Sequence, residues 1–157
     1  MNRPDIDPCL ALHRAYTRLR MQLDEELGTH HGIDFDDFAL LNALALMADT
    51  AGETAADAAG DTAPSLGRVA AELGTSRSML LRRLRPLEKT GLVACHAAAT
   101  ARRVGLRAPG FGVVTIARET VARVCARPAL AREAEALAAA LHGWRRANDA
   151  YHGMGAG

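Results

Sequence analysis

Hydrophobic residues near the start of the chain recur at the spacing of an α-helix. Between residues 9 and 28 the apolar positions lie three or four residues apart, so they share one helical face. These positions are Leu12, Tyr16, Leu19, Leu23 and Leu27. Gly28 is expected to end this helix, because glycine is a weak helix former.

A second helix is predicted from Asp34 to about Ala48. The Asp34 carboxylate can accept a hydrogen bond from the unpaired N–H groups of the first turn, and the helix dipole favours Asp37 there. Four apolar residues are expected to face inward: Phe38, Leu41, Leu44 and Ala45. Residues 49–64 are small and acidic, which predicts a flexible loop.

Two short helices around a glycine are predicted next. Ser65 is expected to cap a helix over residues 66–73, which Gly74 ends. Ser76 is expected to cap the following helix, which runs to about Thr90 with Gly91 at its end. Pro86 lies inside that helix and lacks a backbone N–H, so a kink or an early end is expected there.

A β-hairpin is predicted after these helices. Residues 92–95 begin a strand, residues 96–101 form the tip, and residues 103–107 return. Val104 and Leu106 alternate with arginines in the returning strand, as expected when one face of a strand is buried.

The last third of the chain is predicted to be helical again. Pro109, Gly110 and Gly112 are expected to form a turn. One helical stripe then consists of Val114, Ala117, Val121 and Val124, and Pro128 closes it. A narrower seam suited to a partner helix consists of Leu130, Ala134, Leu137, Leu141 and Trp144.

The predicted order is helix, helix, helix-turn-helix, β-hairpin, helix, helix. It indicates a mainly α protein with a small β-hairpin (α+β), built as one chain of 157 residues. Aromatic residues are only 4% of the chain, so the core must consist of Leu, Val, Ala and Met. No run of about 18 apolar residues occurs, and the N-terminus is acidic rather than cationic, so we expect a cytoplasmic protein without membrane contact.

Charge is distributed unevenly along the chain. Residues 1–64 contain 4 arginines and 12 acids, whereas residues 65–127 contain 12 Arg or Lys and only 3 acids. Residues 128–157 are balanced. A basic middle between acidic and neutral flanks is typical of a nucleic-acid-binding module, and duplex DNA is the predicted partner.

Residues 66–84 satisfy the requirements of a helix-turn-helix. Ala70 is small where the helices cross, and Gly74 tolerates the positive φ of the turn. The second helix exposes polar and basic residues, namely Ser76, Arg77, Ser78, Arg82 and Arg85. Arginines on such a helix can reach guanine in the major groove, and serines can hold phosphates. Arg102 and Arg103 in the hairpin can grip DNA alongside.

The segment SLGRVAAELGTSRSMLLRRLRPLEKTGLV and the hairpin after it resemble the MarR family of winged-helix regulators. The resemblance implies a winged helix-turn-helix region over residues 34–108, with the loop at 49–64 longer than usual. It implies that helices in residues 9–32 and 113–150 hold a homodimer. It further implies a transcription regulator, a repressor in our expectation, that binds a palindromic operator and is released by a small ligand or by cysteine oxidation.

The match assigns residues 76–85 to the family's recognition helix and Arg102 to the arginine of its wing motif Asp-x-Arg. Thr100 stands where the family has the aspartate that orients this arginine. Ala108 and Pro109 stand where the family has Leu-Thr. The wing is therefore expected to be more mobile, or Arg103 shares the role of Arg102.

Two kinds of effector are suggested by the resemblance. Cys9 resembles the reactive cysteine of the peroxide-sensing branch, but Phe35 and Phe38 replace the tyrosines that bond its sulfur there. An inert apolar role for Cys9 is the simpler interpretation. A small-molecule pocket is expected near Tyr16, Phe35 and Phe38, although these aromatics can also be plain core.

Other classes of function find little support in the sequence. The six histidines and three cysteines show neither a paired metal-ligand spacing nor a CxxC motif, so we expect no metal and no cofactor. No nucleophile elbow, phosphate-binding glycine loop or paired carboxylates indicate an enzyme. A winged-helix module that binds another protein instead of DNA remains an alternative.

Overall fold

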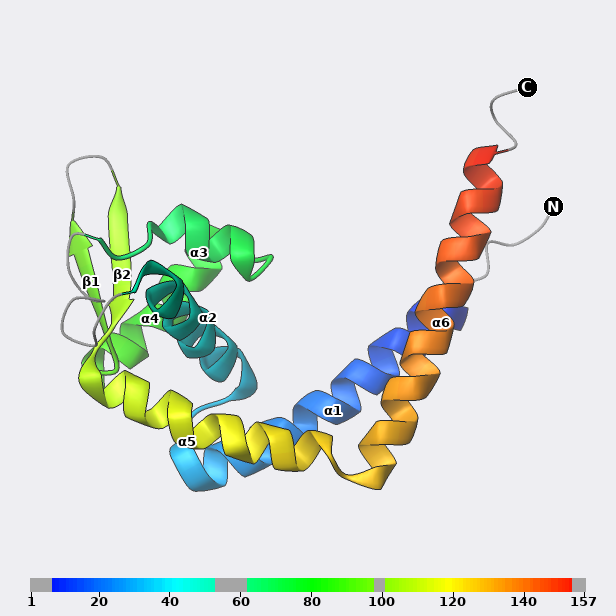
Figure 1. Cartoon of the computed structure of the whole chain (residues 1–157), viewed down its shortest axis with the longest axis horizontal. Coiled ribbons are helices and arrows are strands. Elements are labelled where there is room, and N and C mark those ends of the chain that lie inside the picture. Colours follow the sequence, from blue (N-terminus) through cyan, green and yellow to red (C-terminus); the bar gives the residue numbers. More distant parts are fainter. Residues whose placement is uncertain (1–6, 53–61, 98–100, 154–157) are drawn as a thin grey trace.

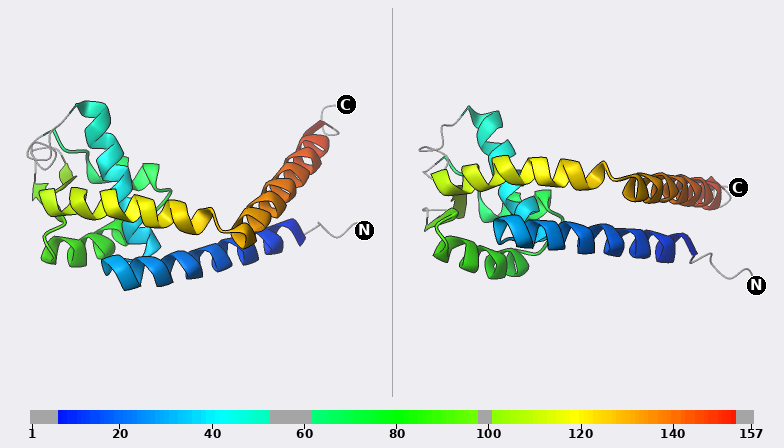
Figure 2. Two further views of the ribbon diagram at one scale, coloured as in Figure 1. Left: turned by 60° about the horizontal axis from the view of Figure 1, so that its bottom comes forward. Right: turned by 90° about the horizontal axis from the view of Figure 1, so that it is seen from below.

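Helices α1, α5 and α6 form the long part of the molecule, and the other elements gather at one end of it (Figures 1 and 2). The computed structural model describes residues 7–52, 62–97 and 101–153. Its elements are α1 (Asp7–His31), α2 (Phe35–Ala51), α3 (Leu66–Glu72), α4 (Arg77–Lys89), β1 (Val93–Ala97), β2 (Arg102–Leu106), α5 (Ala108–Cys125) and α6 (Pro128–Gly153). The predicted order of elements and the mainly helical class are confirmed.

The end that contains α2, α3, α4 and the hairpin is joined to α1 through the start of α2 and to α6 through α5 (Figure 1). Helix α5 starts beside the hairpin and runs along α1, and α6 continues away from the hairpin end and contacts α1 farther out. Helix α5 thus connects the hairpin to α6 and packs along α1 on the way.

One hydrophobic core holds these elements together. Every helix and both strands contribute buried side chains to it, among them Leu23, Leu27, Leu41, Leu44, Val69, Leu80, Leu84, Val93, Val104, Leu106, Val114, Val124 and Leu130. Full burial of a Val or Leu side chain contributes about 1.5–3 kcal/mol. The four residues of α2 that were expected to face inward are all buried.

The start of α2 is fixed by the capping hydrogen bond that the sequence predicts. Asp34 caps α2, and its carboxylate accepts a hydrogen bond of 2.7 Å from the backbone N–H of Asp37. Helix α2 continues to Ala51, beyond the predicted end near Ala48. The predicted loop at 49–64 lies mostly outside the described residues.

One predicted helix end is wrong. Helix α1 passes through Gly28 to His31, and Gly32 ends it with a φ of 68°. Helix α4 passes through Pro86 to Lys89 and is capped by Thr90, so its predicted end near Thr90 is confirmed and no early end occurs at Pro86. A glycine lowers the stability of a helix by only about 1 kcal/mol. Burial of Leu27 on α1 and of Leu87 on α4 offsets the local costs of Gly28 and Pro86.

The predicted turn at Pro109, Gly110 and Gly112 is also wrong, because these residues form the start of α5. Proline is well tolerated in a first turn, where its missing N–H has no helical partner anyway. Gly110 is buried against the backbone carbonyl of Leu92. Its lack of a side chain lets α5 start directly against the segment that leads into β1.

The hairpin is antiparallel and pairs Val93 with Leu106 and Ala97 with Arg102. Strand β1 continues into the predicted tip, and β2 begins one residue earlier than expected. Residues 98–100, and Thr100 with them, lie outside the described residues. Within the ranges given above, no helix is long and apolar enough to cross a membrane.

Candidate nucleic-acid interface

The turn between α3 and α4 has the geometry that the sequence predicts. Ser65 caps α3 and Ser76 caps α4, with the Ser76 hydroxyl accepting a hydrogen bond of 3.2 Å from the N–H of Met79. Gly74 adopts a φ of 60°. Ala70 is buried, as the close approach of the two helices requires.

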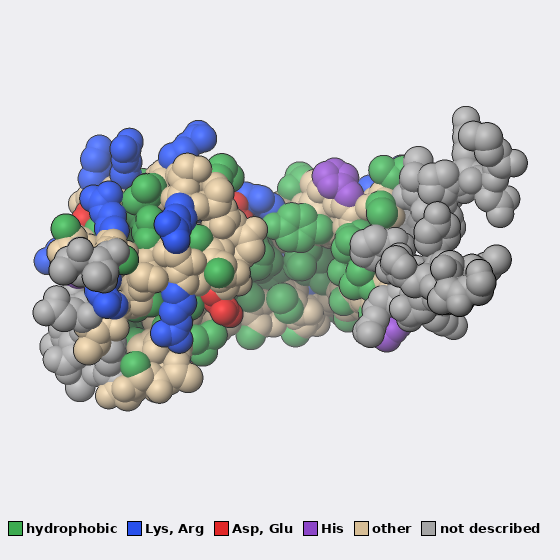
Figure 3. Space-filling model, turned by 90° about the horizontal axis from the view of Figure 1, so that it is seen from above, with side chains coloured by type: hydrophobic (Ala, Val, Ile, Leu, Met, Phe, Trp, Pro, Cys, Tyr) green, Lys and Arg blue, Asp and Glu red, His purple; other side chains and the backbone are tan. Residues whose placement is uncertain are grey.

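Helix α4 has one buried face and one exposed face. Leu80, Leu84 and Leu87 pack into the core. All five polar or basic residues predicted to face outward are exposed: Ser76, Arg77, Ser78, Arg82 and Arg85. Figure 3 shows that Lys and Arg side chains gather over this end of the molecule, where few carboxylates are visible.

Arg77 lies back over α3. A β-carbon added to Gly67 would come within 2.7 Å of Arg77 Nη2. The bare backbone of Gly67 therefore makes room for this guanidinium at the start of α4, beside the Ser76 cap.

The two hairpin arginines are placed differently. Arg102 is exposed, whereas Arg103 is half-buried and donates a hydrogen bond of 2.6 Å to the carbonyl of Ala63. The N–H of Val104 donates to the carbonyl of Pro64 at 3.1 Å. Arg103 thus fastens the hairpin to the segment before α3, and Arg102 is the hairpin arginine that is turned to solvent.

Arg83 is a functional candidate that the sequence reasoning missed. Its side chain on α4 is only 31% exposed and points at the start of α2. Nη1 donates to both carboxylate oxygens of Asp34 at 2.9 Å and to Asp37 at 3.2 Å, and Nη2 donates to Asp36. The available signals were its place between Leu80 and Leu84 and the run of acids at residues 34–37.

These contacts shift the pKa values of the groups in opposite directions. Burial acts to raise the pKa of Asp34, but the N–H of Asp37 and the Arg83 guanidinium outweigh it and hold that pKa below its usual value. Burial and the neighbouring Asp34 raise the pKa of Asp37. Burial acts to lower the pKa of Arg83, yet the three carboxylates raise it, so the guanidinium stays charged.

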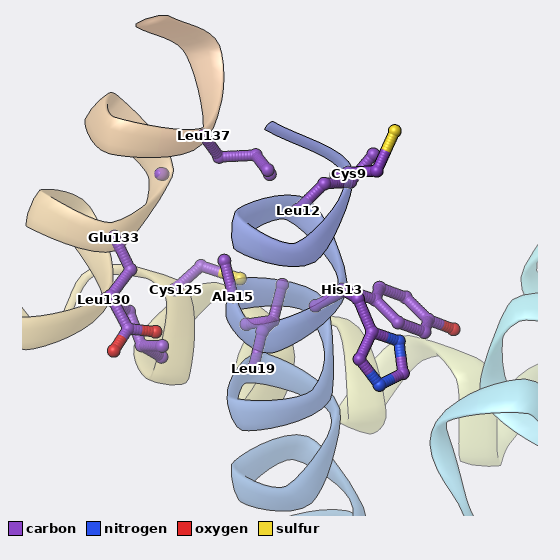
Figure 4. A pocket seen from close by; sticks show the side chains of 11 residues that line it. Cys9, Leu12, His13, Ala15, Leu19, Cys125, Leu130, Glu133 and Leu137 are labelled. Atoms are coloured by element: carbon purple, nitrogen blue, oxygen red, sulfur yellow. The ribbon is translucent and has the colours of Figure 1, made fainter. Parts of the chain in front are cut away.

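An apolar pocket of about 520 Å³ lies between α1 and α6 (Figure 4). It is lined by Cys9, Leu12, His13, Ala15, Tyr16, Leu19, Cys125, Leu130, Glu133, Ala134 and Leu137. Phe35 and Phe38 lie elsewhere, with their rings stacked and the ring centroids 6.2 Å apart. They border a groove of about 480 Å³ between α2 and α3. The structure therefore does not bring Tyr16 together with the two phenylalanines.

The three cysteines are free thiols. Cys9 and Cys125 are exposed, and the Cys9 sulfur points away from the α6 side of the pocket (Figure 4). Burial and Glu88 raise the pKa of the half-buried Cys95 thiol. In the part of the chain that the structure describes, no three His, Cys, Asp or Glu side chains are grouped to hold a metal ion.

Comparisons with known proteins bear on the fold. No family model and no curated protein matches the sequence. Several solved structures match the coordinates, and those below are each less than 25% identical to this chain, so they bear on the fold alone.

The M. tuberculosis regulator MosR in complex with DNA is 24% identical, with a TM-score of 0.57, over 86% of this chain and 97% of that one. CouR from Rhodococcus jostii RHA1, bound to p-coumaroyl-CoA, is 18% identical, with a TM-score of 0.60, over 74% and 72% of the two chains. A MarR-family regulator from Rhodococcus sp. RHA1 is 16% identical, with a TM-score of 0.64, over 81% and 83%. The chain therefore has the winged helix-turn-helix fold of the MarR-family transcriptional regulators.

Proposed function

We propose that this chain is a DNA-binding transcription regulator of the MarR family, a repressor that binds a palindromic operator as a homodimer. The single observation that supports DNA binding most strongly is the exposed face of α4, which carries Arg82 and Arg85 and begins at the Ser76 cap. In a helix-turn-helix the second helix enters the major groove, and arginine recognises guanine O6 and N7 there. MosR, which shares the fold, was solved with DNA bound.

The wing contributes a second contact in this proposal. Arg102 is exposed on β2, so it is free to reach the DNA backbone or a narrow minor groove. Arg103 holds the hairpin in place through its hydrogen bond to the Ala63 carbonyl. Each residue therefore has a distinct role, one in contact and one in holding the hairpin.

A second copy of the chain is the proposed occupant of the apolar surface on α1 and α6. The pocket there is lined mainly by hydrophobic side chains, and Leu10 and Tyr16 on α1 and Leu141 on α6 are exposed. A symmetric pairing through this surface presents two α4 helices, which is why a palindromic site is expected.

A small ligand is the proposed signal that releases DNA. CouR, with the same fold, is bound to p-coumaroyl-CoA. In this chain the groove beside Phe35 and Phe38 offers stacked aromatic rings between α2 and α3, next to the helix-turn-helix. A ligand wedged between these helices would move α3 relative to α2.

Redox sensing through Cys9 is the second candidate, because Cys9 is exposed and borders the same pocket as Cys125. Loss of DNA binding under mild peroxide that Cys9→Ser abolishes would support it. Peroxide-insensitive binding would leave the small ligand as the proposed signal.

Selection of bound sites from random duplex DNA tests the main proposal. A palindrome with half-sites about one helical turn apart is the expected product. Its affinity should fall steeply with salt, because each neutralised phosphate releases counterions. Retention of no duplex at low ionic strength would instead favour a protein-interaction module.

A further inference from the structure

A chain of ion pairs connects α4 to α1 through the start of α2. Arg83 of α4 binds the carboxylates of Asp34, Asp36 and Asp37. Asp36 also accepts a hydrogen bond of 2.6 Å from Arg20 of α1. Asp36 therefore bridges a guanidinium from each of two helices.

The same junction is fixed to the backbone on both sides. Asp24 of α1 accepts a hydrogen bond of 2.7 Å from the N–H of Phe35, the first residue of α2, and also contacts Arg20 at 3.5 Å. Asp34 caps α2 while it binds Arg83. The start of α2 is thus held from α1 and from α4 at once.

We propose that Arg83 is a positioning residue that sets the angle of α4 relative to α1 and thereby the spacing of half-sites that two copies recognise. This inference rests on the proposed function, in which α1 belongs to the dimer interface and α4 to the DNA interface. Since α1 is shared with the partner copy, any rotation of α4 about the Asp36 junction changes the distance between the two α4 helices.

The chemistry of the contact suits a positioning role. A guanidinium is a planar fork that holds carboxylates in a fixed geometry, whereas a lysine ammonium is a point charge on a flexible stem. Arg83 uses both terminal nitrogens on these carboxylates, so they are not directed at solvent as those of an exposed arginine are. Its three partners are themselves 19% to 42% exposed, so the junction is partly shielded from water.

The alternative is that Arg83 holds a DNA phosphate, and three variants separate the two roles. Arg83→Gln removes the fork and the charge, Arg83→Lys keeps the charge without the fork, and Asp36→Asn breaks the bridge while removing a negative charge. Arg82→Gln is the matched control, because Arg82 is the neighbouring exposed arginine on α4.

The probes are duplexes that carry the half-sites obtained by selection from random DNA. The half-sites stand at the spacing found in that selection, or with one base pair added or removed between them. For Arg83→Gln we expect an affinity at the selected spacing about tenfold lower and a weaker preference among the three spacings. The salt slope, which is the change of log affinity with log salt concentration, should stay unchanged. For Arg83→Lys the spacing preference should stay weak. For Arg82→Gln binding should weaken and the base preference should relax, with the spacing order preserved.

Asp36→Asn gives the sharpest contrast. Loss of a negative charge near DNA would by itself tighten binding, whereas the positioning role requires weaker binding at the selected spacing and a flatter preference. Tighter binding with the preference intact would overturn the inference. So would wild-type spacing preference in Arg83→Lys, or a salt slope reduced by about one in Arg83→Gln.

Thermal unfolding of each variant guards against a trivial loss of structure. If Arg83→Gln does not fold, Arg83→Lys and Asp36→Asn still decide the question. Failure of the wild-type chain to bind any duplex would remove the proposed function itself. Wild-type binding with spacing preferences that none of the variants alters would remove only the positioning role.

Discussion

At the scale of single residues, exposure separates arginines that look alike in the sequence. Arg82 and Arg83 are adjacent on α4, yet Arg82 is exposed and Arg83 is bound to three carboxylates. Arg102 and Arg103 show the same division on β2. Only one member of each pair is exposed, which makes single substitutions informative.

The substitution Arg82→Ala is expected to weaken binding to the selected operator by about 1–3 kcal/mol and to relax the preference at one base position, because an arginine that reads guanine is lost. Titration by fluorescence anisotropy at fixed salt measures this. Arg132→Ala, an exposed arginine on α6, is the control and should leave base preference unchanged. Equal affinity of Arg82→Ala and the wild type would contradict the assignment.

Two glycines in the first turns of α5 differ in the space around them. A β-carbon at Gly110 would collide with the Leu92 carbonyl and come within 2.8 Å of Leu106 Cδ2, whereas one at Gly112 would meet nothing within 4 Å. Gly110→Ala should therefore destabilise the fold by about 1–3 kcal/mol.

Gly112→Ala, by contrast, should be neutral or stabilise it by up to about 1 kcal/mol, as alanine favours a helix. Thermal unfolding distinguishes the two variants, because the melting temperature shifts by roughly 2–4 °C per kcal/mol for a chain of this size. Equal melting temperatures would show that the start of α5 adapts to the added methyl group.

At the scale of elements, polar contacts hold α1 against the α5–α6 junction. Glu26 of α1 accepts a hydrogen bond from Arg127, which lies between α5 and α6, and His30 approaches it at 3.5 Å. The Arg127 hydrogen bond is the main reason that the pKa of Glu26 lies below its usual value. The position of α6 is thus tied to α1 by charge as well as by Leu130.

The pH dependence of this tie follows from the sign of the shift. A carboxyl whose pKa is lowered in the folded state stabilises the fold above its unfolded pKa, about 4.3, and loses that contribution as the pH falls through the lower folded pKa. Arg127→Ala should move the Glu26 pKa back toward its usual value in an NMR titration. Arg14→Ala, an exposed arginine elsewhere on α1, should not. An unmoved Glu26 pKa in Arg127→Ala would show that the contact does not persist in solution.

At the scale of the whole molecule, the apolar surface of α1 and α6 and the basic surface of α4 lie in different parts of the chain (Figures 1 and 3). This separation suits a protein that pairs through one end and binds through the other. Leu141 is 38% exposed on the predicted seam of α6. The seam extends to Trp144, whose side chain lies outside the described residues.

Leu141→Glu is expected to shift the chain from dimer to monomer, because burying a carboxylate in an apolar interface is costly. Light scattering at micromolar concentration measures the mass directly. Ala139→Glu places the same charge at another exposed position of α6, two residues from Leu137 and off the seam, and should leave the dimer intact. A wild-type chain that is already monomeric would refute the pairing itself.

The sequence by itself determined the elements and much of the helix-turn-helix, because their signals are local. Ser65, Ser76 and Asp34 each cap a helix through an N–H three residues away, and Gly74 takes the one backbone conformation that its turn requires. The alternation around Val104 likewise marked the buried face of the hairpin. Such features depend only on residues a few positions apart in the sequence.

Only the tertiary structure decided which side chains meet across the molecule. Arg83 and its carboxylates are separated by 46 to 49 positions, and Arg103 and Ala63 by 40. Tyr16 and the two phenylalanines, expected together, border separate cavities, and Gly110 lies in the first turn of α5, close against the Leu92 carbonyl. These outcomes depend on how packed helices are oriented, and the free energy that orients them comes from the whole core rather than from any one segment.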